Sequence, residues 1–577
     1  MIRPAPWPVL ATAAFLLSAC TVHSSTSGVE SRTGVHAPLV AAAGGTVSVA
    51  VDGVPTTLND HTMSGDDPAT RAVASLVWAQ VFQIGPGASP KLDTTVVQSA
   101  EVVSVNPQTV VYQINPAAVW SDGTPISAQD FVYAWLSQSG TGQDVDGTAD
   151  SVASTAGYRD IASVVGSNAG RTVTVVFQTP FADWPSLFND LLPAHVAEHA
   201  GWNHGFDHFD AATLVSAGPW VVSAWRPGEM LELSPNPHWW GPAPHLDHVV
   251  LQAMAGAPAM AQALRAGQVQ VAEPGAFDGA FAAAVSSSPF LQSRSSLGTT
   301  VLQLVFNTRH APLDLPAVRQ GIAHGVDRPA LVTALAQPLD SLVWEDNDHL
   351  FANSQLWYAD DAAGYESADP ATAARLLATG GLVADGNGTW TLSDAPVVLH
   401  LTWASDDPWS AGAGPAIAAQ LVNGGFDVVT QPVSMAQLLG TVLPMGDFDL
   451  ALAPLSTGPY PSAMAAAFGT PTVATSTSLD WSGFDDPKID ALFVQASQQL
   501  AASQAQLLYQ QIDSALWTSM PSLPLFAEPT VAAWDVRLAG VDDDPGGLGL
   551  LWSVDRWTRL IPAPQHVPVS SQPKSGG

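Results

Sequence analysis

The chain has 577 residues, of which 47% are hydrophobic, and its 51 acidic against 18 basic side chains give a formal net charge of −33. This length exceeds that of a usual single domain, so two or three domains with substantial cores are expected. A surface this acidic repels phosphate backbones and anionic lipid head groups, which excludes a nucleic-acid-binding protein.

The first twenty residues have the pattern of a lipoprotein signal peptide. Arg3 is the only early charge, and the apolar run Val9–Ala19 is too short to span a bilayer core of about 30 Å. This run indicates the hydrophobic region of a signal peptide. It ends in Leu17–Cys20, LSAC, which resembles the bacterial lipobox, whose cysteine receives a diacylglycerol. An ordinary secretory signal with a chance cysteine is the alternative.

The segments that flank the folded body are expected to be flexible. Residues 21–43 are rich in Ser, Thr, Gly and Ala, which predicts a tether between the lipid and the body. Residues 561–577 are rich in Pro, Ser and Gly, which predicts a disordered tail. Cys20 is the only cysteine, so no disulfide within the chain is expected. The predicted location is the outer face of the cytoplasmic membrane, reached through the lipid on Cys20.

Strand and helix patterns alternate along the first half of the body. Gly44–Thr62 is predicted to be a strand followed by a turn, and Val102–Trp120 to be a hairpin. Ser127 can cap the next helix, with Asp130 as the acid of a capping box. A strand is expected at Thr172–Thr179. A helix at Pro180–Leu192 and a helix, turn and strand over Ala257–Ala272 complete this half.

The second half begins with a buried strand, because Val301–Val305 alternates apolar and polar residues. Asp314 can cap the helix that follows, and Pro316 fits its first turn. Asp327 can cap a second helix. Strands at Val397–Trp403, Phe426–Gln431 and Gly446–Ala453, and helices at Gly414–Gly425 and Gly483–Ala496, are expected further on.

The order of these elements and their motifs resembles the family 5 extracellular solute-binding proteins, the oligopeptide- and dipeptide-binding lipoproteins of ABC importers. The motif in Phe306–Arg328 is FN, a short loop, then VR-x-x-I-x-x-x-V-D-R, and Ser121–Phe131 is similar to the family element that begins SDG. In the first turn, Asp60 replaces a proline of the family pattern. AGAPA at Ala255–Ala259 and ALRAG at Ala263–Gly267 are similar to an actinobacterial branch, which includes mycobacterial oligopeptide-binding lipoproteins and LpqW.

The resemblance implies an α/β fold of the periplasmic-binding-protein type, with two lobes, three subdomains and mixed sheets flanked by helices. The ligand cleft would lie between the lobes, which close by a hinge motion. Lobe 1 would comprise residues 44–304 and 522–560, including an extra subdomain at about residues 80–200, and lobe 2 would comprise residues 305–521.

The resemblance also bears on the ligand. In peptide-binding relatives, an aspartate in a loop after a buried strand pairs with the N-terminal amine of the peptide. Gly458 stands at that position here, and Leu455 stands where a tryptophan would precede it. A buried ammonium without a partner costs several kcal/mol. A free peptide N-terminus is therefore an unsuitable ligand unless another acid replaces the anchor, and the candidates for this are Asp346, Asp348 and Asp406.

Aromatic and polar side chains supply the other ligand-binding candidates. The chain has 20 tryptophans, and Trp and Tyr rings stack well on flat ligands and sugars. The alternative is that most of them belong to the hydrophobic core. The candidates for ligand binding are Trp78, Asn347, His349, Trp403, Asp406 and Tyr460.

Two further patterns could indicate a metal. His195, Glu198 and His199 form H-x-x-E-H, an inverted zinc-protease pattern, in which both histidines would share one face of a helix. The alternative is that they are ordinary residues at a helix start. Asp144–Asp150 has some character of a calcium loop, and the alternative is a solvated acidic loop. No catalytic residue, metal or cofactor is predicted.

The sequence therefore predicts a membrane-anchored binding protein and not an enzyme. It is expected to be a monomer that captures a peptide-like or other small solute and presents it to ABC permease subunits. The alternative is an LpqW-like cell-envelope lipoprotein that acts in the synthesis of glycolipids, namely phosphatidylinositol mannoside and lipoarabinomannan, without transport. A zinc hydrolase built on His195, Glu198 and His199 is a remote alternative.

Overall fold

The computed structural model describes residues 39–85, 87–336, 343–362, 364–470, 479–542 and 549–563. Nearly all of these residues belong to one compact unit, Ala41–Ile561. The predicted signal peptide with Cys20, residues 21–38 of the predicted tether and residues 564–577 of the predicted tail lie outside the described residues. Within the predicted tether, Leu39–Ala42 forms a strand, β1. Within the described ranges, no helix has the length and apolar character needed to cross a membrane.

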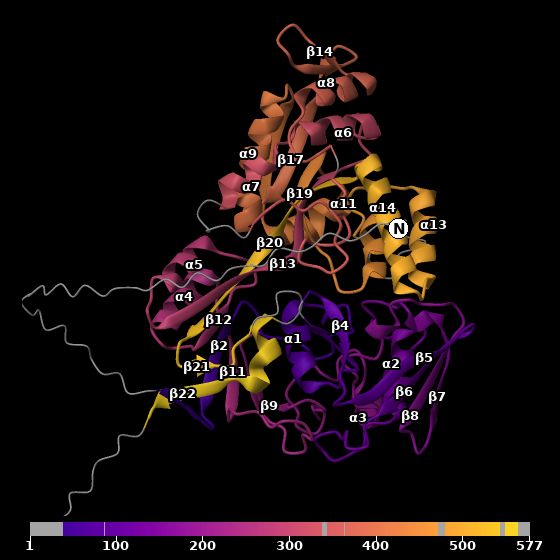
Figure 1. Ribbon diagram of the computed structural model, residues 1–577, viewed down its shortest axis with the longest axis vertical. Coiled ribbons are helices and arrows are strands. Elements are labelled where there is room, and N and C mark those ends of the chain that lie inside the picture. The colour runs from indigo at the N-terminus through magenta and orange to yellow at the C-terminus, as the bar shows by residue number, and fades with distance from the viewer. Residues whose placement is uncertain are drawn as a thin grey trace, which may run out of the picture. The chain divides into compact units, whose positions relative to one another are not determined.

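A ten-stranded mixed sheet runs through this unit (Figure 1). Its strand order is β18-β17-β19-β13-β20-β12-β2-β11-β10-β9, so strands from both halves of the sequence share one sheet. The strands are β2 (Thr46–Val51), β9 (Trp220–Arg226), β10 (Met230–Pro235), β11 (His248–Ala253), β12 (Val271–Glu273), β13 (Leu291–Phe306), β17 (Val398–Ala404), β18 (Asp427–Val433), β19 (Leu450–Ser456) and β20 (Ser522–Asp535).

The two longest strands, β13 and β20, connect the two ends of this sheet. The first part of β13 pairs with Pro529–Asp535, and its second part pairs with Ser522–Ala527 on one side and with β19 on the other. The pairing shifts register between Leu297 and Val301. The predicted crossing points near residues 304 and 522 fall at one end of this strand pair, and the lobe boundaries themselves stay a prediction.

A separate four-stranded antiparallel sheet lies within the predicted extra subdomain, with the order β5-β6-β8-β7. Helix α2 (Ala128–Gln138) begins at the predicted capping box, in which Ser127 and Asp130 each bond the backbone at the position of the other. Tyr112 and Phe131 pack together in the core of this subdomain, with ring centroids 5.5 Å apart. Its strands are β5 (Val97–Val105), β6 (Gln108–Ile114), β7 (Ile161–Ser167) and β8 (Thr172–Phe177).

The helix predicted at Pro180–Leu192 is wrong. The structure has only a short 3-10 turn at Trp184–Ser186, followed by an irregular turn. Phe188 and Asp190 have φ values of 63° and 51°, in the left-handed region that an α-helix does not use. The apolar side chains that suggested a helix are still buried, because Leu187 is 1% and Phe188 0% exposed. Burial thus follows the hydrophobic pattern although the backbone does not.

Helices flank the sheet strands in the second half of the chain. Pro316 begins α6 (Pro316–Gly325) as predicted, but Asp314 does not cap it, because Leu315 occupies the N-cap position. Asp327 does cap α7, since its carboxylate accepts from the Ala330 N–H at 3.0 Å. The other helices of eight or more residues are α1 (Pro68–Val77), α4 (Ala257–Arg265), α5 (Gly279–Ser286), α7 (Arg328–Ala336), α8 (Pro370–Thr379), α9 (Pro408–Asn423), α13 (Pro487–Gln498) and α14 (Ala502–Ser519).

Both arginines of the family motif in Phe306–Arg328 are buried in the fold. Arg328 is 1% exposed, and its guanidinium donates to the carbonyls of Asp346 at 2.9 Å and Pro524 at 3.0 Å. Arg319 donates to the carbonyls of Leu313 at 2.6 Å and Met520 at 2.8 Å. Carbonyl partners compensate part of the cost of burying a cation. These two residues therefore tie α6 and α7 to the segment that begins β20.

The stability of the folded chain should fall as pH rises from about 5 to about 8. Burial raises the pKa of Asp60 to about 7 and the pKa values of Asp346 and Glu528 to about 8. Above the ordinary carboxyl pKa of about 4, the native state then holds protons that the unfolded chain has released, so the unfolding free energy decreases with pH. Burial lowers the pKa values of His61 and His324, which acts in the opposite direction.

Thermal unfolding at the two pH values measures this dependence. Because the three carboxyl groups outweigh the two histidines, the midpoint should be higher at the lower pH. The variant Asp346→Asn removes one raised group and should show a weaker dependence than the wild type. A midpoint that rises toward about pH 8, or an Asp346→Asn variant with unchanged pH dependence, would contradict this assignment.

Candidate functional site

A cleft of about 1030 Å³ lies where three parts of the chain meet. One wall comes from the loop after β2, from α1 and from the turn that ends at Asp190. A second comes from the register shift of the long strand pair, at Gly298–Thr300 and Glu528–Thr530. A third comes from the loop after β19, at Gly458–Tyr460. The cleft therefore takes its walls from both ends of the sheet and from the strands that join them.

Hydrogen bonds join the two sides along the rim of this cleft. The Tyr460 hydroxyl donates to the carbonyl of Pro185 at 3.0 Å, and the Ser462 N–H donates to the carboxylate of Asp183 at 2.9 Å. The Ala182 N–H also donates to the carbonyl of Ser497 at 2.6 Å. Residues 182–185 thus contact residues 460–497 directly next to the cleft.

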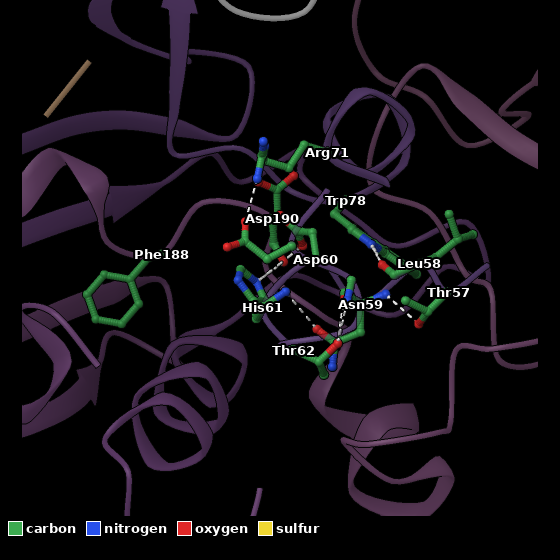
Figure 2. Close-up of polar contacts among 12 residues, drawn as sticks. Thr57, Leu58, Asn59, Asp60, His61, Thr62, Arg71, Trp78, Phe188 and Asp190 are labelled. Atoms are coloured by element: carbon green, nitrogen blue, oxygen red, sulfur yellow. Dashed lines mark hydrogen bonds and ion pairs between the residues drawn. The ribbon is translucent and has the colours of Figure 1, made fainter. Parts of the chain in front are cut away.

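The loop Thr57–Thr62 lies at the start of the first cleft wall (Figure 2). Hydrogen bonds within the loop and with neighbouring residues hold it in place. The Asn59 amide donates to the carbonyl of Trp202 at 2.8 Å and accepts from the His61 N–H at 3.2 Å. The Trp78 indole N–H donates to the carbonyl of Leu58 at 2.7 Å. These bonds fix the direction in which the next residue, Asp60, presents its carboxyl group.

Asp60, His61 and Asp190 form a polar cluster that lines the cleft, in which Asp60 is buried and the other two residues are partly buried (Figure 2). Burial raises the pKa of Asp60 to about 7, and the nearby charge of Arg71 opposes this rise only in part. Burial and the neighbouring charge of Asp60 raise the pKa of Asp190 well above its usual range. His61 donates from Nε2 to the Asp190 carbonyl at 2.9 Å, and burial lowers its pKa. Because the pKa values of both carboxyl groups are raised and a charge on one raises the pKa of the other, the pair retains a proton to a higher pH than a free aspartate does.

Charged and polar neighbours complete the surroundings of this cluster. The Gln80 amide donates to the carboxylate of Asp190. Arg71 of α1 pairs with Asp66, and its positive charge also lowers the pKa of Asp60, although by less than burial raises it. The Asp60 side chain is 9% exposed, and its Oδ1 atom has no hydrogen-bond partner within the described part of the chain. His61 Nε2 lies 3.8 Å from that atom, which is too far for a hydrogen bond.

Two of the six ligand-binding candidates, Trp78 and Tyr460, line the cleft. Trp78 is only 1% exposed, so its ring forms part of the wall and presents little surface to a ligand. Tyr460 projects from the loop that contains Gly458, and its hydroxyl is engaged in the rim contact with Pro185. Their role in ligand binding stays a prediction.

The other four candidates are not among the residues that line this cleft. Trp403 is 6% exposed in a hydrophobic cluster of the second lobe. The Asp406 carboxylate accepts from the Met435 N–H at 2.7 Å, and the Asn347 amide donates to Asp360 at 2.9 Å. His349 is 1% exposed, with Nδ1 at 2.8 Å from Asp513. Each of these side chains already has a partner or a packing role within its own lobe.

The acids proposed to replace the missing anchor are engaged elsewhere as well. Asp346 accepts from the N–H groups of Asp348 and Asn353, and Asp348 accepts from those of Leu350 and Phe351. They organise the loop after residue 345 instead of lining the cleft. The carboxyl groups that do line it are those of Asp60, Asp66, Asp93, Asp190, Glu528 and Asp555.

Sequence reasoning missed Asp60, Asp190 and Glu528 for different reasons. The signal for Asp60 was present, since it stands where the family pattern has a proline. Asp190 lay in a stretch whose apolar spacing suggested a helix, and Glu528 lies inside an apolar strand without a motif around it. Their common surroundings depend on contacts between distant segments, which the sequence does not display.

The two metal patterns are occupied by ordinary polar contacts. His195 Nε2 lies 2.8 Å from the Asp122 carboxylate, at the start of the seven-residue helix α3 (Ala194–Ala200). In the acidic loop, the Asp144 carboxylate accepts from the Trp202 N–H at 2.8 Å and Asp146 from the Thr148 N–H at 2.9 Å. No group of three or more His, Cys, Asp or Glu side chains within the described ranges could hold a metal ion.

Two lobes joined by a pair of long strands, with a cleft at the junction, define the chain as a binding protein of the periplasmic type. Its residues 91–475 match the family described as "Bacterial extracellular solute-binding proteins, family 5 Middle". The match covers more than half of the chain, and the protein belongs to this family.

Two mycobacterial binding proteins are similar to this chain over most of its length. The chain is 29% identical to the oligopeptide-binding protein OppA of Mycobacterium tuberculosis over 505 residues, which are 86% of this chain and 82% of OppA. It is 29% identical over 407 residues to the probable monoacyl phosphatidylinositol tetramannoside-binding protein LpqW of the same organism, covering 69% of this chain and 61% of LpqW.

Solved structures share the fold. The periplasmic EDTA-binding protein EppA superposes with a TM-score of 0.81 at 26% identity, covering 92% of this chain and 99% of EppA. The oligopeptide-binding protein AppA from Bacillus subtilis, solved with a nonapeptide, has a TM-score of 0.72 at 18% identity, covering 90% of this chain and all of AppA. The second likeness is one of fold alone.

Replacing His349 by glutamine should destabilise the fold by about 2–4 kcal/mol, because the buried Asp513 loses its charge-assisted partner. His400→Gln is a matched control. His400 also lies 2.8 Å from an aspartate, Asp449, but its side chain is 44% exposed against 0% for His349. The control should cost less than about 1 kcal/mol. Urea unfolding measures both values, and equal costs would contradict a structural role for His349.

Proposed function

We propose that the protein is a lipid-anchored receptor of an ABC import system that captures a peptide-like or other small solute in the cleft. The observation that carries this proposal is the cleft itself, whose volume of about 1030 Å³ lies at the junction of the two lobes. Cavities of about 300–1,000 Å³ are typical of small-ligand sites, so the volume suits a solute of several residues or rings.

The mechanism is capture without chemistry. Gly298–Thr300 and the residues around Glu528, where the strand pair changes register, form the floor of the cleft and lie where the lobes would rotate. A solute that contacts both lobes stabilises the closed arrangement. The stabilisation equals the difference between the solute's interaction free energies with the closed and with the open arrangement. The closed form would then present the solute to the permease subunits.

A peptide is the solute class that the relatives favour. OppA is named as an oligopeptide-binding protein, and AppA was solved with a nonapeptide. EppA is named for binding EDTA, so the same fold can also accept a solute that is not a peptide. Gly458 lines the cleft, and we infer that it stands where peptide-binding members of the family have an amine-anchoring aspartate. A bound peptide would therefore be held without an anchor at that position.

Restoring the anchor should change the preference for a free peptide N-terminus. A side chain can be added at Gly458, because nothing lies within 4 Å of a Cβ atom there. In Gly458→Asp, the affinity ratio of free over N-acetylated peptides should rise at least about tenfold relative to wild type, since the new carboxylate can pair with the ammonium group.

Isothermal titration of a peptide library with both N-terminal forms measures this ratio. Gly458→Asn is the matched control, with the same size and no charge, and should leave the ratio near that of the wild type. Equal ratios in the Asp and Asn variants would contradict the placement of Gly458 at the anchor position of a peptide site. Absence of binding by any peptide to the wild type would contradict the peptide class.

Anchoring by Cys20 is the second part of the proposal. A relative matched over 549 residues at 24% identity is named as the lipoprotein Rv2585c of Mycobacterium tuberculosis, which supports a lipid on this chain. In Cys20→Ala, the protein should move from the membrane fraction to the soluble fraction and lose labelling by a fatty-acid probe, while its cleft still binds solute. A wild type that takes up no lipid label, or a variant that stays on the membrane, would contradict this.

A glycolipid ligand is the second candidate function, favoured by the likeness to LpqW over 69% of this chain. In that case the cleft would hold the head group of a phosphatidylinositol mannoside, and no permease would be needed. Peptide libraries would then fail to bind, and a mannosylated inositol phospholipid would shift the thermal unfolding midpoint instead.

A further inference from the structure

We propose that Asp60 and Asp190 form a subsite for an organic cation, a guanidinium or primary ammonium group carried by the solute. The subsite lies on the wall of the cleft that is formed by the loop after β2 and by the turn that ends at Asp190. The inference rests on the proposed function only in taking this cleft as the place where a solute binds.

The geometry of Asp60 is the first support. Its side chain is more than nine-tenths buried, lines the cleft, and carries an Oδ1 atom without a hydrogen-bond partner within the described part of the chain. A buried acceptor left without a partner has lost its hydrogen bonds to water without replacement, which is unfavourable. A ligand N–H group that reaches Oδ1 from the cleft would supply the missing donor. The unsatisfied acceptor therefore suits a cationic group that carries N–H donors.

The electrostatics of the cluster also favour a cation. Asp60, Asp66 and Asp190 face one positive group, Arg71, which already pairs with Asp66. His61 gives its Nε2 proton to the Asp190 carbonyl and faces the cluster as a neutral ring. The neighbouring phenols of Tyr158 and Tyr460 are uncharged, because burial raises their pKa values further. With one proton shared by the two carboxyl groups, one negative charge remains unbalanced.

A cation can take the place of that shared proton. When a guanidinium group binds, the proton between Asp60 and Asp190 passes to the solvent, and both carboxylates accept N–H groups from the ligand. Guanidinium presents five donors in a planar fork, which matches two adjacent carboxylates. The exchange leaves the net charge of the occupied site unchanged, so the low-dielectric surroundings do not oppose it as they would oppose an added charge.

The two carboxyl groups are also held in place before a ligand arrives. Asn59 and Trp78 fix the loop that carries Asp60. The Gln80 amide and the His61 ring hold Asp190, and the His61 ring stacks on Trp202 with centroids 5.7 Å apart. Groups that are already ordered lose little conformational entropy when a ligand binds. Little of the interaction free energy with the ligand is therefore offset by ordering these groups.

Glu528 is the rival position for the same chemistry. It lines the cleft on the strand-pair floor, and its Oε1 atom also has no hydrogen-bond partner within the described residues. Glu528 is a single carboxyl group beside Asp407, whereas Asp60 and Asp190 offer two carboxyl groups to one cation. We therefore place the subsite at Asp60 and Asp190, and a test must separate the two positions.

The test compares cationic probes with neutral probes of the same shape on the full chain in detergent. Isothermal titration is made with agmatine and its carbamoyl analogue, and with short peptides that carry either arginine or citrulline at one position. The wild type should prefer the cationic member of each pair at least about tenfold. Asp60→Asn and Asp190→Asn should each reduce the preference to about twofold or less.

Controls separate the subsite from general charge and from Glu528. Asp427→Asn removes one exposed carboxylate on β18 and should keep the full preference. Glu528→Gln should keep the ratio of arginine to citrulline affinity even if both affinities change. Thermal unfolding confirms that each variant is folded. Titration of the wild type at about pH 7 in two buffers should show release of about one proton on binding of the cation, and Asp190→Asn should show none.

Each outcome decides the inference. Equal affinity for the arginine and citrulline peptides would overturn the subsite and leave the proposed function standing. A preference that survives both aspartate variants, or that only Glu528→Gln removes, would overturn its position. Failure of agmatine and of every peptide to bind would overturn it too. Agmatine binding without any peptide binding would support the subsite and contradict the peptide class of the proposed function.

Discussion

The antiparallel pairing of β13 with β20 is the interaction on which the arrangement of this molecule depends. These strands carry the chain between the two ends of one sheet, and their register shifts at the centre of the pairing. The shift leaves Gly298–Thr300 and Glu528 facing the cleft instead of completing a regular ladder. Arg319 and Arg328 bind backbone carbonyls at the start of β20 and so hold the returning strand against α6 and α7. The pairing of β13 with β20 is regular at both of its ends and shifts register in the middle, and the cleft lies at this shift.

The second constraint is the cost of burying charge in a chain that has a net charge of −33. Most acids can stay in water, yet Asp60, Asp190 and Glu528 lie at the cleft, where burial raises their pKa values. Packing gives no reason for carboxyl groups at these positions, since apolar residues would cost less. Perturbed acids that face one cavity are a common mark of a binding site. The proposals for this cleft take these acids as its specific polar groups.

Local sequence patterns predicted local structure well. The capping box of Ser127 and Asp130 and the cap of α7 by Asp327 were predictable because each depends on residues three positions apart. The helix predicted at Pro180–Leu192 was wrong, because apolar spacing reports burial and does not report the left-handed φ values of Phe188 and Asp190. Asp314 failed as a cap because the helix begins one residue later than its position requires.

The site was harder to predict than the fold. His349 and Trp403 were candidates because of their residue type alone, and their partners are other residues of the same half of the molecule. Trp78 and Tyr460 do line the cleft, although they are 382 positions apart in the sequence. The substitution of Asp60 for a family proline was visible, but its meaning depends on Asp190, which only the folded chain places beside it. Departures from a family pattern mark candidate positions, and tertiary contacts decide which of them share a site.

Native mass spectrometry of the full chain, purified without refolding, tests most directly whether the cleft captures a solute. The account predicts that the wild type carries a bound small molecule whose size fits a cavity of about 1030 Å³. In Gly458→Trp, a large ring would enter the open space at that position, and the bound mass should be lost while the protein stays folded. A wild type that is empty and binds no added solute, or a bound mass that persists in Gly458→Trp, would contradict capture in this cleft.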